Sequence, residues 1–187
     1  MKRLRHLLAR FARDDRGVTS IEFVIVFPVL FGFFLMTFES GMITAKHVML
    51  ERGVDIAVRD VRIGVIPNPT RNQLRERICE VALIIPDCIN QLDLEMMRRD
   101  PQAWVALPNT IECINRGEVN PNELPIDTTA NHQLMVLRVC ARIDALLPTT
   151  GLGKVIVREN ANSAADGSLA LVATAAFVVE PFRSSGS

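Results

Sequence analysis

The longest apolar stretch of the chain runs from Ile21 to Phe38, and Glu22 is the only charged residue among its 18 positions. At a rise of about 1.5 Å per residue, a helix of this length spans about 27 Å, close to the bilayer hydrocarbon thickness of about 30 Å. Helices of soluble proteins are rarely apolar on every face. The pattern therefore predicts a membrane-spanning helix, and the alternative is a buried helix of a soluble protein.

Beyond the apolar stretch the pattern becomes amphipathic. Apolar residues recur at helical spacing at Leu50, Val54, Val58 and Val61. The run Pro67-Asn68-Pro69 supplies a stop signal. We expect one helix from about Val18 to Ile63, which packs its second half against the domain that follows. Gly53 is expected to weaken this helix by about 1 kcal/mol relative to Ala.

Residues 65–187 are numerous enough to form a core of their own. Thr70 and Gln73 have the spacing of a capping box that opens a helix, and Pro86 is its expected stop. The hydrophobic pattern predicts five strands, near Leu92–Arg98, Thr110–Ile114, Gln133–Ile143, Lys154–Arg158 and Ser168–Glu180. The last is apolar on both faces, which predicts a buried central strand. The expected fold class is α+β, with the long N-terminal helix packed on a small antiparallel sheet.

The formal net charge of zero conceals two unlike parts. Residues 1–17 hold six basic and two acidic residues, a net charge of +4, whereas the rest of the chain holds 15 basic and 19 acidic residues, a net charge of −4. Basic flanks stay on the cytoplasmic side of a membrane, so the N-terminus is expected inside and the domain outside. This topology accounts for the basic residues, and without interleaved aromatic residues we expect no nucleic-acid binding.

Four cysteines lie in the part of the chain that is expected to be exported. An even number in an oxidising compartment predicts two disulfides, for which three connectivities are possible. We favour Cys79–Cys88, which brackets a helix end, and Cys113–Cys140, which can join a strand to a loop. A zinc site is the alternative, but there is no C-x-x-C motif and His132 is the only histidine of the domain. We therefore expect no metal and no cofactor.

Enzyme chemistry has little support in the sequence. Ser163, Asp166 and His132 do not form a recognised nucleophile motif. Gly151-x-Gly153-Lys154 lacks the remaining residues of a phosphate-binding loop. No catalytic residue is therefore assigned, and we expect a protein that is not an enzyme.

Glu22 is the feature that points to a specific function. A carboxylate costs about 2.5–3.5 kcal/mol at the centre of a bilayer and therefore needs a partner. The string Arg16-Gly17-Val18-Thr19-Ser20-Ile21-Glu22-Phe23 resembles the processing site of type IV prepilins. The resemblance implies a cut after Gly17 that leaves Val18 as first residue, Glu22 as fifth and Phe23 as sixth. The new amine of Val18 can then pair with Glu22 of the same or a neighbouring subunit.

A wider resemblance selects one branch of these proteins. With Pro28, the segment Phe38–Gly41 and the closing segment Phe177–Phe182, the chain resembles TadE/TadF-like pseudopilins of the Tad/Flp tight-adherence pilus. The resemblance implies a minor, non-catalytic, pilin-like subunit with a basic leader (1–17), a long helix (18–64) and an exported domain (65–187).

The same resemblance implies the partners and the location. The partners are the prepilin peptidase, a major Flp-type pilin, a second TadE/TadF-like subunit and the inner-membrane assembly platform. The location is the bacterial inner membrane, in a single pass, with possible incorporation into a pilus. Two alternatives stay open. One is a minor pseudopilin of a type II secretion system, and the other is a signal-anchored protein whose exported domain binds a ligand or acts as a sensor.

Overall fold

The computed structural model of the chain describes residues 18–103, 106–108, 111, 113, 114, 116, 125–127, 132–146, 155 and 167–181. Its elements, in chain order, are α2 (Val18–Arg62), α3 (Arg71–Val81), α4 (Cys88–Gln91), β1 (Leu92–Arg99), β2 (Leu134–Ile143) and β3 (Leu169–Val178). The chain divides into two compact units, Met1–Phe38 and Glu39–Ser187, and the boundary falls within α2.

Helix α2 confirms the expectation of one long helix, because it continues through Pro28 and ends at Arg62. Its second half lies in the Glu39–Ser187 unit and buries a stripe made of Leu50, Val54, Ala57 and Val61. Val58, which we placed in the stripe, is only partly buried and packs at the margin of the core. Ala57, one position earlier, is completely buried and lies closer to the centre of the buried face.

Helix α3 begins with the expected capping box. The backbone N of Thr70 donates to Oε1 of Gln73 at 2.9 Å, and the backbone N of Gln73 donates to Oγ1 of Thr70 at 3.4 Å. The helix ends at Val81, earlier than the stop that we expected from Pro86. Ile85 is nevertheless buried, because the chain after the helix continues over the core.

Helix α3 packs closely against α2. The contact includes an ion pair in which Nε of Arg77 in α3 donates to Oδ2 of Asp60 in α2 at 2.7 Å. Within α3, Nη1 of the same arginine donates to Glu80 at 2.8 Å. The hydrogen bonds to Glu80 and Asp60 raise the pKa of Arg77 above its ordinary value. These polar contacts lie beside the apolar contact of the two helices and fix the position of α3 along α2.

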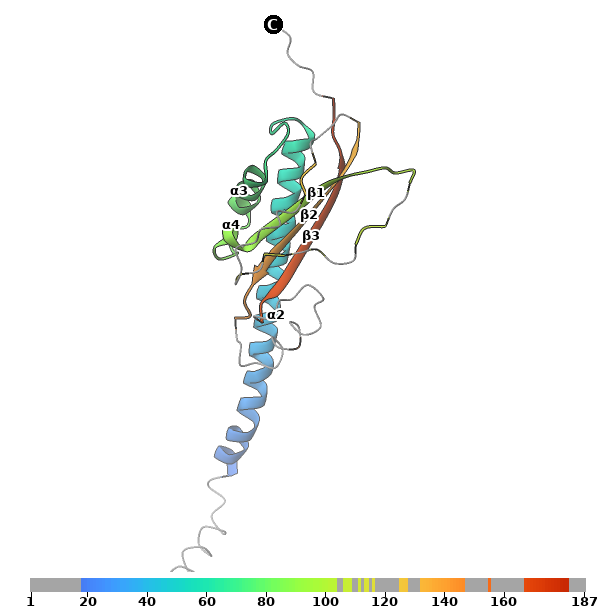
Figure 1. Cartoon of the computed structure of the whole chain (residues 1–187). Coiled ribbons are helices and arrows are strands. Elements are labelled where there is room, and N and C mark those ends of the chain that lie inside the picture. The colour runs from blue at the N-terminus through green and yellow to red at the C-terminus, as the bar shows by residue number, and fades with distance from the viewer. Residues whose placement is uncertain are drawn as a thin grey trace, which may run out of the picture. The chain divides into compact units, whose positions relative to one another are not determined.

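The three strands form one antiparallel sheet in the order β1-β2-β3 (Figure 1). One face of this sheet packs against the stripe of α2 and against α3, which together form the main core. From β2 the core receives Met135, Leu137, Val139, Ala141 and Ile143, the alternate residues that the sequence pattern selected. The α+β fold, with a long apolar N-terminal helix followed by a small antiparallel sheet, is therefore confirmed.

The opposite face of the sheet is more buried than an amphipathic strand pattern suggests. Arg138 is 5 % exposed and lies opposite Glu95 in the strand register, with 3.0 Å between Nη1 and Oε1. Arg142 is 7 % exposed, and its Nε donates to the carbonyl of Ile114 at 3.2 Å. A segment that includes Ile114 crosses this face, so arginines that alternate with the core residues are also covered.

Two strand predictions need correction. The last strand is not a central strand: β3 lies at one side of the sheet and pairs only with β2 among the described residues. Its uncharged sequence reflects burial of most of one face and of part of the other. In the predicted strand Thr110–Ile114, the three described residues are not in a strand, because this segment is held by a disulfide and side-chain contacts. Of Lys154–Arg158, all but Val155 lie outside the described residues.

Candidate functional site

The first turn of α2 contains most of the predicted processing site. The helix begins at Val18, the residue expected to become the new N-terminus. Gly17 lies outside the described residues. Glu22 follows Val18 by four residues, which is about one helical turn, and its side chain is exposed. A charged group at this position is therefore open to contact with another chain or with the N-terminal amine.

Four phenylalanine rings stack along one side of the same helix, a feature that the sequence analysis did not single out. The ring centroids of Phe23 and Phe27 are 5.1 Å apart, those of Phe27 and Phe31 are 5.5 Å apart, and those of Phe31 and Phe34 are 6.3 Å apart. Each ring is roughly half exposed, between 46 and 64 %. The sequence signal for this stacking was the spacing of three or four residues between successive phenylalanines, because residues at this spacing are neighbours on a helix surface.

Within the part of the chain that the structure describes, no segment buries this apolar part of α2. Among the described residues, one helix is long and apolar enough to cross a bilayer, and none of its most apolar part is buried. The hydroxyl of Thr37 donates to the carbonyl of Phe33 at 2.9 Å, so this polar side chain is satisfied within the helix. An exposed surface of this kind is unfavourable in water, and it fits a single-pass anchor in lipid or contact with other apolar helices.

The two disulfides have the connectivity that we favoured. Cys79 is bonded to Cys88 and joins the last turn of α3 to the first residue of α4. Cys113 is bonded to Cys140 and joins the segment that crosses the sheet to the middle strand. No free cysteine and no cluster of potential metal ligands occurs among the described residues.

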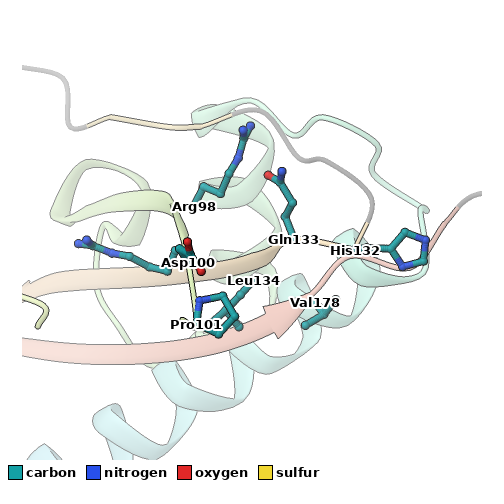
Figure 2. A pocket seen from close by; sticks show the side chains of 8 residues that line it. Arg98, Asp100, Pro101, His132, Gln133, Leu134 and Val178 are labelled. Atoms are coloured by element: carbon teal, nitrogen blue, oxygen red, sulfur yellow. The ribbon is translucent and has the colours of Figure 1, made fainter. Parts of the chain in front are cut away.

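A cavity of about 500 Å³ lies at one end of the sheet, and sequence reasoning did not predict it. Its lining comes from the end of β1, the start of β2 and the end of β3, as Figure 2 shows. Two arginines and one aspartate line it, together with polar and apolar residues: Arg98, Arg99, Asp100, Pro101, His132, Gln133, Leu134 and Val178. His132 has a left-handed backbone, with φ of 62°. This composition suits an anionic or amphipathic ligand, and the lining contains no serine or cysteine to act as a nucleophile.

The comparisons with known proteins agree with the resemblance. Residues 17–59 match the family model of TadE-like proteins. No curated protein matches the chain, and no solved structure matches it. The N-terminal segment is therefore similar to TadE-like proteins. The match covers the predicted processing site from Gly17 onward, the apolar helix and most of the amphipathic helix, but none of the sheet.

Proposed function

We propose that this protein is a minor pilin-like subunit, a pseudopilin, that supports assembly of a Tad/Flp-type pilus or a related secretion filament. It has a structural role without catalysis of its own. One observation carries the proposal: the TadE-like segment starts at Gly17, and the exposed apolar helix starts at Val18 with Glu22 one turn later. This is the arrangement that a prepilin peptidase substrate needs at its processing site.

The chemistry of assembly follows from the charges. The basic leader holds the peptide bond after Gly17 on the cytoplasmic side of the inner membrane until the peptidase cuts it. The cut replaces a neutral amide by the cationic amine of Val18. Glu22 can pair with this amine, either in the same chain or in a neighbouring subunit. Pairing offsets part of the cost of a carboxylate in lipid, about 2.5–3.5 kcal/mol at mid-bilayer.

The stacked phenylalanines provide the apolar contact in this scheme. In the membrane they face lipid, and in an assembled filament they face the helices of other subunits. The partners proposed for this surface are a major Flp-type pilin and a second TadE/TadF-like subunit, with the inner-membrane platform as the place of assembly. The exported domain stays on the periplasmic side of the membrane or on the filament surface.

Intact-mass measurement of the membrane protein tests the proposal. The full chain is expressed in cells that contain a prepilin peptidase, together with a pilin that is known to be cut there. The expected product begins at Val18, and Gly17→Leu should leave Met1 in place because a large side chain fills the cleavage position. Gly32→Leu is the matched control, and it should still be cut. If the known pilin is cut and this chain retains Met1, the proposal is wrong.

The cavity favours a second candidate function, a membrane-anchored protein whose exported domain binds a small anionic ligand. The specific observation in support is a lining in which two arginines and one aspartate lie beside apolar residues. The same mass measurement separates the two candidates, because an anchored sensor needs its uncut N-terminal segment and retains Met1.

A further inference from the structure

The cavity at the end of the sheet adjoins a second, smaller cavity of about 260 Å³. Both are lined by the same four residues, Arg99, Asp100, Pro101 and Leu134, three of which are labelled in Figure 2. The rest of the second cavity is apolar and is lined by Ala106, Leu107 and Val136. The two cavities therefore form one site with a polar compartment and an apolar compartment.

Arg99 is a partly buried cation of the shared wall. Its Nη2 donates to Sδ of Met97 at 2.8 Å, and a thioether is only a weak acceptor. Its Nε is buried without a hydrogen-bond partner, and its guanidinium has no carboxylate partner among the described residues. Arg138 in the same sheet, by contrast, pairs with Glu95. A guanidinium that is withdrawn from water without an anion is unfavourable, so Arg99 favours a ligand with an anionic group.

The same site also holds hydrogen-bond acceptors that the described part of the chain leaves unused. Oδ1 of Asp100 accepts from the backbone N of Gln102 at 2.8 Å, and Oδ2 has no partner among the described residues. Oε1 of Gln133 is likewise without a partner. An ionised carboxylate can only accept hydrogen bonds. Asp100 therefore favours a ligand that carries a cationic donor in addition to its anionic group.

Apolar residues lie directly beside these polar groups. In the strand register Leu134 is opposite Arg99, and Val178 is opposite Leu134, so the three share one row of the sheet. Val136, two residues after Leu134 in β2, continues the same face into the apolar compartment. A ligand that fills both compartments must carry an apolar group close to its charged groups.

We propose that this site binds a free α-amino acid with an apolar side chain. The carboxylate binds Arg99, the ammonium group donates to Asp100 and Gln133, and the side chain lies beside Leu134 and Val136. A fatty acid lacks the cationic donor and phosphate lacks the apolar group, so neither complements all three parts of the wall. The assignment names the ligand class of the second candidate function and rests on it, and it does not depend on cleavage after Gly17.

Equilibrium dialysis of the detergent-solubilised full chain with labelled L-leucine tests the site. The wild-type chain should bind leucine. Arg99→Met removes the cation and keeps the apolar stem, so it should weaken binding at least about tenfold, because hydrogen bonds to charged groups are lost. Arg52→Met is the matched control: Arg52 is exposed in α2 and lines neither cavity, so its loss should leave binding unchanged. Thermal unfolding confirms that each variant is folded.

A second variant tests the apolar compartment without removing a charge. Ala106 is exposed, so Ala106→Phe should preserve the fold while its ring fills part of the second cavity. Binding of leucine should fall at least about tenfold, whereas binding of L-alanine, which has a small side chain, should be unchanged. An equal loss for both amino acids would contradict the proposed position of the side chain.

Competition against labelled leucine separates the possible ligands. Isocaproate, which is leucine without its amino group, and leucinamide, which lacks the carboxylate, should each compete at least about tenfold less well than leucine. A short peptide that ends in leucine should also compete weakly, because it has a neutral N–H in place of the ammonium group.

Four outcomes overturn the proposal. Two of them are an absence of leucine binding by the wild-type chain and undiminished binding by Arg99→Met. The third is isocaproate that competes as well as leucine, which would leave the anionic-ligand function in place but exclude an amino acid. The fourth is a peptide that competes as well as leucine, which would identify a chain terminus as the ligand. Intact mass is measured in the same samples, so failure of this site is distinguished from failure of cleavage.

Discussion

Gly53 in α2 lies directly against the carbonyl of Ile78 in α3, so that a Cβ at position 53 would be 2.8 Å from that oxygen and 3.2 Å from the Ile78 side chain. A backbone oxygen cannot move away as the end of a flexible side chain does. The absence of a side chain at Gly53 therefore allows the two helices to approach. The sequence alone suggested only that Gly53 weakens the helix.

Gly53→Ala should destabilise the domain, although Ala is the better helix former by about 1 kcal/mol. Overpacking costs about 1–3 kcal/mol and exceeds this gain, because the clash is with backbone. Urea unfolding of the full chain in detergent measures the change. Gly41→Ala is the matched control, because a Cβ there meets nothing within 4 Å, and it should be neutral or slightly stabilising. Equal stability of the two variants would contradict the prediction.

Asp93→Asn should destabilise the domain by about 3–5 kcal/mol, because it leaves arginines buried without their carboxylate. Asp93 pairs with Arg71 and lies 3.6 Å from Arg75, and all three side chains are less than 20 % exposed. Glu180→Gln, at an ion pair with Arg62 that is more than half exposed, should cost less than about 1 kcal/mol. Chemical unfolding measures both variants, and similar losses for the two would show that burial does not decide the effect.

Removal of the two disulfides should have unequal effects. Cys113–Cys140 closes a separation of 27 residues and Cys79–Cys88 one of 9. Loop-closure entropy predicts a loss of about 3.6 kcal/mol for the first and about 2.6 kcal/mol for the second. Paired Cys→Ala variants of each bond, compared by urea unfolding, test this order. A larger loss on removing Cys79–Cys88 would show that native packing around that bond outweighs the loop length.

Glu22→Ala should impair assembly with partner subunits more than membrane insertion. The substitution removes the proposed partner of the Val18 amine, whereas it makes the apolar helix easier to insert. Membrane fractionation measures insertion, and co-purification with the major pilin measures assembly. Glu51→Ala is the matched control, because Glu51 is an exposed glutamate of the same helix outside the apolar stretch. Normal assembly of Glu22→Ala would exclude the proposed pairing.

The sequence predicted the local features of the structure well. The long helix, the capping box at Thr70 and the three described strands depend on residues that are near one another in the chain. The pairing of Cys79 with Cys88 also follows from a short separation. The prediction of a strand at Thr110–Ile114 was wrong for the residues that the structure describes. The apolar residues of this segment cover the sheet and do not extend it.

The candidate site was predictable to a similar extent. Gly17, Val18 and Glu22 were assigned from the resemblance to prepilin processing sites, and the TadE-like match covers the same positions. The stacked rings of α2 follow from helical spacing and could have been predicted. The cavity could not, because its lining residues come from the ends of three strands that are distant in the chain.

The sequence by itself determined that this protein has a long apolar helix with one carboxylate near its start, followed by an α+β domain that contains four cysteines. Short-range periodicity, charge and spacing suffice for these features. Only the tertiary structure decided that β3 is an outer strand and that Gly53 is a contact point. Both depend on which distant segments lie side by side: burial makes β3 apolar whether its edge is paired or open, and a glycine reveals its role only when another backbone approaches it.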